Sequence, residues 1–491
     1  MSRLNKDTLF LIFEELQNDP KSLFSCLMVN KRWFETVIPI LWKNPWRFDI
    51  NYSNKNSLFI IITFDLPNNT KEFLKSQGLQ LPSTSYQSLS SNYLSFCKSI
   101  NVEIMNNIIS IGSTSVYDQF LLQQEIYSLL IKKCREMKYL DIISLKHQIF
   151  YFPGATCLGS LIELKCDTSI DPSYFYGLAR VCRRIQRLII INKDLKPNHG
   201  IVKLIEFQEN LKYFQWKDNI EEECFIESPY DKIFFALTKK ADKINHLKIY
   251  FQFIDGCDHT FLQKILPKFS KLKSLIIGDF ILIKEEQLKT SIYQDLEILN
   301  IDYIKMNTVA SMVENSGGHI KEILLKYYYY YYYRDNDFYK DSLIFIRKIY
   351  ENCPEIEYLS LLFSSSKEHF AEFEKLLKVC KNLKSVLLII SNIYERETYE
   401  KIMSNGEELL KVLIKSAPKN LREIRFFDYF KFSLKNLEFF LENWKERPPL
   451  TIITSDSVYN GEAYMKLIDK YKNNGVIKDF RCDSERNIYF R

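Results

Sequence analysis

The sequence predicts an α/β solenoid that follows a short helical motif at the N-terminus. Three observations predict the solenoid. A repeat motif of three apolar residues, at its first, fourth and sixth positions, recurs throughout residues 131–491. Successive copies begin 24 to 38 residues apart, which leaves room for a helix in each interval. Four cysteines stand three residues before a copy, where a small apolar residue suits the end of a helix: Cys134, Cys182, Cys353 and Cys380.

The first element in the chain is the N-terminal motif, residues 1–46. A helix is predicted between Asp7, a favourable first-turn residue, and Asp19-Pro20, where proline ends one helix and favours the start of another. One face of this helix consists of four apolar residues at helical spacing, namely Leu9, Ile12, Phe13 and Leu16. A second helical segment is predicted from the spacing of Leu23, Cys26, Leu27 and Phe34.

The N-terminal motif contains more apolar residues than one internal core requires. Phe10, Leu11, Phe24 and Met28 lie off the first predicted face. A surplus of this kind indicates a surface for a partner. The alternative is that these are the first helices of an ordinary α-helical domain.

The order of these residues resembles the F-box, the helical motif that connects substrate receptors to Skp–cullin ubiquitin ligases. The resemblance implies a set of contacts with a Skp-type adaptor, and through it a cullin, made by Leu4, Leu9, Ile12, Phe13, Leu16, Leu23, Val29 and Trp33. Trp42 adds a further large apolar residue. The chain departs from the family at its start, where Asn5 follows Leu4 and most F-boxes have Leu-Pro. The residue that differs lies at the first turn of the predicted helix, where the family contacts its adaptor.

Residues 47–130 are predicted to form an irregular linker and the start of the solenoid. The apolar run Leu58–Phe64 is too short to cross a membrane and predicts a buried strand. Residues 68–91 are rich in Asn, Ser, Thr, Gln and Pro, which predicts a loop that is partly disordered. Cys97, Ile100 and Val102 match the repeat motif as an early, irregular copy.

The copies of the repeat motif each predict a strand. They are Met137/Leu140/Ile142, Leu161/Leu164/Cys166, Ile185/Leu188/Ile190, Leu211/Phe214/Trp216, Ile244/Leu247/Ile249, Leu272/Leu275/Ile277, Leu296/Leu299/Ile301, Ile320/Ile323/Leu325, Ile356/Leu359/Leu361, Leu383/Val386/Leu388 and Leu421/Ile424/Phe426, with degenerate copies at Leu450 and Ile477. Helical patterns fill the intervals, for example before Met137 and before Leu383. We expect the strands to line a concave face and the helices a convex face.

This pattern resembles the cysteine-containing leucine-rich repeats of F-box receptors, whose period is roughly 20–29 residues. The resemblance implies a horseshoe of strand–turn–helix units. The asparagine or cysteine that usually follows the motif is mostly missing, and Asn219 is its only well-placed copy.

A row of side chains between the last two apolar positions is expected to face away from the core, because side chains alternate along a strand. We predict that the target protein contacts six of them: Gln215, Lys248, Ile276, Asn300, Leu324 and Arg425. Ile189 and Leu387 belong to the same row and are expected to be exposed as further apolar anchors. The row has no arginine cluster of the kind a phosphate pocket needs, which predicts an unmodified protein target. The alternative is that neighbouring loops cover these aliphatic side chains.

The composition excludes several classes of protein. The net charge of +6 is small and dispersed, which gives no reason to expect nucleic acid as a partner. No apolar run is long enough to span a membrane, and the first residues lack a signal-peptide pattern. Eleven cysteines in a chain with these features predict reduced thiols, and therefore a cytoplasmic or nuclear protein.

The seven tyrosines Tyr327–Tyr333 are either a contact platform or an expanded loop.

No catalytic, metal or cofactor motif is recognisable, and we expect the chain not to be an enzyme. Residues 154–160 imitate part of a phosphate-binding loop but lack its lysine. The six histidines are scattered without a ligand spacing, and no paired Cys-x-x-Cys motif is present. The sequence thus predicts a substrate receptor of a Skp–cullin–F-box ligase. The alternatives are a repeat scaffold unrelated to ubiquitin, and an enzyme whose site these motifs do not reveal.

Overall fold

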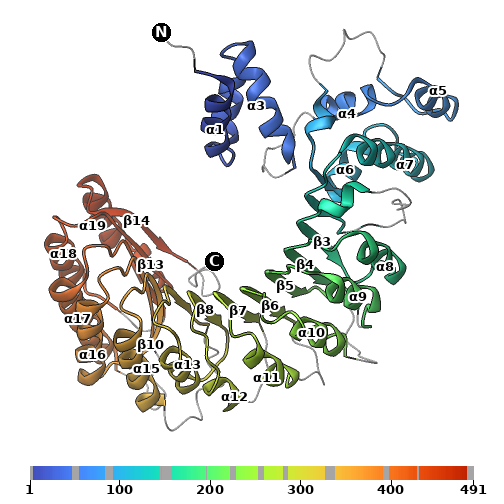
Figure 1. The fold of residues 1–491 in the computed structure, drawn as a ribbon. Helices are drawn as coiled ribbons and strands as arrows, with labels where there is room; N and C mark the ends of the chain where they lie inside the picture. Colours follow the sequence, from blue (N-terminus) through green and yellow to red (C-terminus); the bar gives the residue numbers. More distant parts are fainter. Residues whose placement is uncertain are drawn as a thin grey trace. The chain divides into compact units, whose positions relative to one another are not determined.

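The computed structural model describes residues 4–46, 55–82, 92–143, 145, 156–194, 196–221, 228–252, 259–279, 286–326, 338–390, 398–427 and 431–483. The chain divides into two compact units, Met1–Lys239 and Lys240–Arg491. In each unit, parallel strands alternate with helices that cover one face of the strands (Figure 1). The predicted α/β solenoid is therefore confirmed. Tyr327–Tyr333 lie outside the described residues.

The first unit contains the elements α1 (Lys6–Glu15), α2 (Pro20–Leu27), α3 (Lys31–Lys43), α4 (Lys55–Phe64), α5 (Asn68–Ser76), η1 (Tyr93–Phe96), β1 (Ser99–Asn101), α6 (Val102–Ile109), α7 (Val116–Lys133), β2 (Tyr139–Asp141), η2 (Thr156–Ser160), β3 (Glu163–Asp167), α8 (Pro172–Val181), β4 (Arg187–Asn192), α9 (His199–Phe207), β5 (Tyr213–Asp218) and α10 (Asp231–Thr238).

The second unit contains β6 (His246–Phe251), α11 (Phe261–Ile265), η3 (Leu266–Lys268), β7 (Ser274–Asp279), α12 (Glu286–Lys289), β8 (Ile298–Ile301), α13 (Met306–Glu314), β9 (Glu322–Leu324), α15 (Phe338–Asn352), β10 (Tyr358–Phe363), α16 (Lys367–Val379), β11 (Ser385–Ile390), α17 (Tyr399–Ser416), β12 (Glu423–Phe427), α18 (Leu434–Asn443), β13 (Leu450–Thr454), η4 (Ser457–Asn460), α19 (Glu462–Asn473) and β14 (Ile477–Cys482).

The strands pair in parallel and in the order of the chain, and the repeat motif sets their register. In the first unit the middle apolar residue of each motif pairs with the next: Leu140, Leu164, Leu188 and Phe214. In the second unit the same column runs through Leu247, Leu275, Leu299, Ile323, Leu359, Val386, Ile424 and Ile452. Six leucines at this middle position are all 0% exposed, namely Leu164, Leu188, Leu247, Leu275, Leu299 and Leu359.

The repeated cysteines mark the ends of helices, as the sequence predicts. Cys134, Cys182 and Cys380 are the C-cap residues of α7, α8 and α16, and each backbone N–H donates to the carbonyl four residues earlier. Cys353 makes the equivalent bond to Ile349 at 2.7 Å. All four side chains are buried. Every cysteine in the described residues is a free thiol.

Two predictions for residues 47–130 are wrong. Leu58–Phe64 belongs to the helix α4 and not to a strand, because Phe59, Ile62 and Thr63 are buried as one helical face. The predicted loop at residues 68–91 begins with the helix α5, which buries Leu74, and residues 83–91 lie outside the described residues. The early copy of the repeat motif is real. It forms β1, which pairs with β2, so the repeated strands begin before residue 131.

Candidate protein-binding surfaces

Side-chain caps divide the N-terminal motif into three helices. Asn5 is the N-cap of α1, where its Oδ1 accepts the N–H of Thr8 at 2.7 Å. Asp19 caps α2 through Ser22, whose N–H and hydroxyl both donate to the carboxylate. These two bonds lower the pKa of Asp19. Asn30 caps α3 through the N–H of Trp33 at 3.0 Å, which divides the single segment predicted from Leu23 to Phe34.

The three helices enclose their own apolar core. It consists of Leu9, Phe13, Leu23, Val37, Ile40 and Leu41, and the partly buried Leu16, Cys26, Leu27, Trp33 and Trp42 pack against it. The rings of Phe13 and Trp33 meet edge to face at 5.0 Å. Leu9, Phe13 and Leu23 were predicted to contact an adaptor, and this part of the prediction needs correction. Their side chains hold the helices together and do not face outward.

A second set of apolar side chains in the motif faces solvent. Of the predicted contact residues, Leu4, Ile12 and Val29 are exposed, whereas Leu16 and Trp33 are half-buried. Four further exposed residues are those noted as surplus in the sequence: Phe10, Leu11, Phe24 and Met28. Leu11 is 63% exposed and Met28 is 88% exposed. Residues 9–13 of α1 are therefore apolar on every side of the helix, a pattern typical of a helix that is covered all round.

The N-terminal motif is joined to the first repeats by tryptophans at the end of α3. The indole N–H of Trp46 donates to the carbonyl of Ser99 in β1 at 3.0 Å. The ring of Trp42 lies 5.0 Å from that of Tyr93 in η1, and the N–H of Lys98 donates to the carbonyl of Lys43. Trp42 thus helps to attach the N-terminal motif to the rest of the first unit.

The row of side chains predicted to contact a target is in register but not fully exposed. Lys248, Ile276, Asn300 and Leu324 pair with one another along β6 to β9, so the predicted row exists in the second unit. Each is half-buried, as are Gln215 and Arg425. Ile189 and Leu387 are buried, so the prediction that they are exposed anchors is wrong.

Partners within the chain occupy several polar members of this row. The amide of Asn300 donates to Glu322 at 2.7 Å and its oxygen accepts the N–H of Leu324 at 2.9 Å. Arg425 pairs with Glu423 at 2.7 Å. Gln215 accepts the hydroxyl of Tyr213 at 2.7 Å. Contact between this row and a target stays a prediction.

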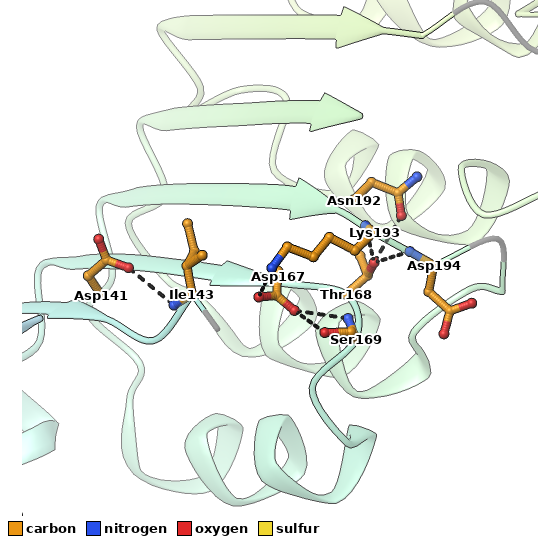
Figure 2. Close-up of polar contacts among 8 residues, drawn as sticks. All are labelled: Asp141, Ile143, Asp167, Thr168, Ser169, Asn192, Lys193 and Asp194. Atoms are coloured by element: carbon orange, nitrogen blue, oxygen red, sulfur yellow. Dashed lines mark hydrogen bonds and ion pairs between the residues drawn. The ribbon is translucent and has the colours of Figure 1, made fainter. Parts of the chain in front are cut away.

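Buried polar side chains link the ends of successive strands in the first unit (Figure 2). Thr168 donates to the oxygen of Asn192 at 3.0 Å and accepts the N–H groups of Lys193 and Asp194. The Asp167 carboxylate accepts from Ser169 and pairs with the ammonium of Lys193 at 3.2 Å. These bonds fix the loops that leave β3 and β4.

The same chain of hydrogen bonds continues to β5. The amide of Asn192 donates to Asp218 at 2.9 Å, and Asp218 also accepts the indole N–H of Trp216 and the hydroxyl of Tyr230. A carboxylate that accepts from three donors is fixed in position, which suits a structural role.

The sequence analysis did not identify these residues, because it expected the polar residue three positions after the last apolar residue of the motif, as at Asn219. Thr168, Asn192 and Asp218 each follow the last apolar residue of a motif by two positions. Asn219, which was predicted to be the well-placed copy, contributes only its backbone N–H to this region, through a bond to Asn192 at 2.8 Å. A column of small polar residues at that position was the available signal.

Several cysteines and the histidine His369 are buried among the repeats. Burial raises the pKa of Cys182, Cys353 and Cys380 to about 12, so these thiols are protonated at neutral pH. Burial lowers the pKa of His369 to about 4, and its ring nitrogens bond to Ser342 at 2.8 Å and Ser366 at 2.9 Å. Among the described residues, no cluster of His, Cys, Asp and Glu is placed to hold a metal. Within the same residues, no helix is long and apolar enough to cross a membrane.

Comparisons with known proteins leave the family of this chain open. No family model matches the sequence, and no curated protein matches it. Rad7, in the crystal structure of the yeast Rad7 and Elc1 complex, is 13% identical, with 68% of this chain and 85% of that chain covered and a TM-score of 0.35. A Bacteroides fragilis protein is 11% identical, with 62% and 69% covered and a TM-score of 0.29. At these TM-scores the fold assignment rests on the structure itself.

Proposed function

We propose that this chain is a substrate receptor of a Skp–cullin–F-box ubiquitin ligase. The N-terminal motif would act as an F-box that binds a Skp-type adaptor, and the leucine-rich repeats would hold a target protein. The chain itself is then a non-catalytic subunit, and the adaptor connects it to a cullin. Such a receptor acts by raising the concentration of its target near a ubiquitin-charged enzyme. Free thiols in the described residues fit a cytoplasmic or nuclear protein.

One observation carries this proposal: residues 9–13 of α1 are apolar on every side of the helix, although the motif already has an apolar core. Leu9 and Phe13 fill that core, while Leu11 and Ile12 remain exposed on the same helix. Exposed apolar surface of this kind is the usual contact for a partner protein. We infer a revised contact set of Leu4, Phe10, Leu11, Ile12, Phe24, Met28 and Val29.

Co-purification with a Skp-type adaptor tests the proposal. The double change Leu11→Lys and Ile12→Lys keeps good helix formers in α1 and removes its exposed apolar surface. We expect recovery of the adaptor to fall at least roughly ten-fold, as loss of a central interface contact does. Phe13 is left unchanged, because its truncation would unfold the motif and confuse the result.

The matched control is another adjacent pair of exposed apolar residues, Val116→Lys and Tyr117→Lys at the start of α7. This control should recover the adaptor as the wild type does. If the wild-type chain recovers no adaptor, the rival function is favoured, in which the repeats form a scaffold unrelated to ubiquitin transfer.

A further inference from the structure

An open groove runs along the ends of three helices in the second unit. The helices α16, α17 and α18 end at Val379, Ser416 and Asn443, and each is followed by a turn that leads to the next strand. The groove has a volume of about 1300 Å³. This exceeds the range of roughly 300–1,000 Å³ that is typical of small-molecule pockets, and it suits a stretch of polypeptide.

Among the charged residues that line the groove, cations outnumber acids. The cations are Lys378, Lys381, Lys415, Lys419, Lys445 and Arg447, whereas the acidic residues are Glu442 and Glu446. Three of the cations are engaged within the chain. Lys378 and Lys415 both pair with Glu374. Arg447 donates to the carbonyls of Ile414 and Ala417, at the end of α17.

The other three lysines form a repeated feature. Lys381 and Lys445 directly follow the C-cap residues of α16 and α18, and Lys419 lies two residues beyond that of α17. All three are exposed, and no carboxylate of the described residues forms an ion pair with them. Three neighbouring repeats therefore present one unpaired ammonium group each along the groove.

We propose that this groove binds an acidic polypeptide segment, with Lys381, Lys419 and Lys445 pairing with its carboxylates. A peptide fits better than a nucleic acid for two reasons. The continuous phosphates of a nucleic acid would meet Glu442 and Glu446, whereas a peptide can place its charges between them. The lining also has no aromatic ring for bases to stack on. This site does not depend on adaptor binding by the N-terminal motif.

Fluorescence anisotropy of the full chain with a labelled peptide of alternating glutamate and glycine tests the proposal. We expect saturable binding that weakens as salt rises. The triple change Lys381→Glu, Lys419→Glu and Lys445→Glu should weaken binding at least roughly ten-fold, because three attractive contacts become repulsive.

The matched control changes Lys264, Lys268 and Lys271 to glutamate, which reverses their charge. These lysines are also exposed and belong to an earlier repeat of the same unit. This control should bind the peptide as the wild type does. If lysines beyond the helix ends only balance the helix dipoles, the groove variant would lower the thermal midpoint and leave peptide binding unchanged, which would overturn the proposal. Should the glutamate variant fail to fold, the three Lys→Gln changes replace it. Tighter binding of a single-stranded oligonucleotide than of the peptide would also overturn the proposal.

Discussion

The N-terminal motif and the repeats are built from the same apolar residues but use them differently. In the repeats, the middle residue of each motif is completely buried between neighbouring strands. In the N-terminal motif, Leu9 and Phe13 are buried, yet Leu11 and Met28 on the same small unit are mostly exposed. The repeats thus bury their apolar side chains within the chain, whereas the N-terminal motif leaves several of its apolar side chains exposed to solvent.

The largest expected effect of this difference is on stability. Leu275→Ala removes a side chain that is 0% exposed, so the free energy of unfolding should fall by about 2–5 kcal/mol. Leu11→Ala removes a side chain that is 63% exposed, and it should change stability by no more than about 0.5 kcal/mol. Urea unfolding of both variants checks this. Equal losses would remove the distinction between the two regions.

A second effect depends on pH and concerns the repeats alone. The core of the N-terminal motif is apolar, whereas the second unit buries His369 and lowers its pKa from 6.5 to about 4, mainly by desolvation. Between pH 6.5 and pH 4, His369 is therefore protonated in the unfolded chain but neutral in the folded chain. The stability from this group is complete above pH 6.5 and is lost as pH falls toward 4, by up to about 3 kcal/mol.

His369→Gln removes this titration and keeps a hydrogen-bonding side chain between Ser342 and Ser366. Unfolding measured from pH 7 to pH 4 should show a shallower decline in the variant than in the wild type. An identical decline would mean that His369 is not buried in its neutral form.

The helix N-caps of the two regions should also differ in how much stability they contribute, and this difference is smaller than the two effects above. Asn198 caps α9 and, being buried, also donates to the carbonyls of Thr168 and Ile170 at 3.0 and 2.8 Å. Asn198→Ala leaves those groups without their partner and should cost about 2–3 kcal/mol. Asn30 is exposed and satisfies one N–H of α3, so Asn30→Ala should cost about 1 kcal/mol. Hydrogen exchange of α9 and of α3 measures each loss locally, and a larger loss at Asn30 would contradict the comparison.

The sequence predicted the repeated strands well because one constraint determines them. A parallel strand that is buried on its core side must repeat its apolar positions in register, as Leu247, Leu275 and Leu299 do. The cysteines before the motifs were informative for the same reason, since each occupies the tight junction between a helix and a strand.

Other features depend on contacts that spacing alone does not reveal. The β-branched run in α4 favoured a strand, but burial of Phe59 and Ile62 on one side selects a helix. Leu9 and Ile12 are equally apolar in sequence, and only the packing of α3 against α1 buries the first and exposes the second. Likewise, Ile189 and Leu387 are buried, although the alternation of side chains along a strand placed them on the outer side.

The most direct test of the central claim combines both regions in one titration. A purified Skp-type adaptor is titrated by calorimetry into the wild-type chain, into the variant Leu11→Lys with Ile12→Lys, and into Leu275→Ala, with the thermal midpoint recorded for each. We expect the first variant to lose adaptor binding and keep its midpoint, and the second to lose several degrees and keep its affinity while folded. Unchanged adaptor affinity in the first variant would contradict the account, because the exposed apolar side chains of α1 would then have no part in binding.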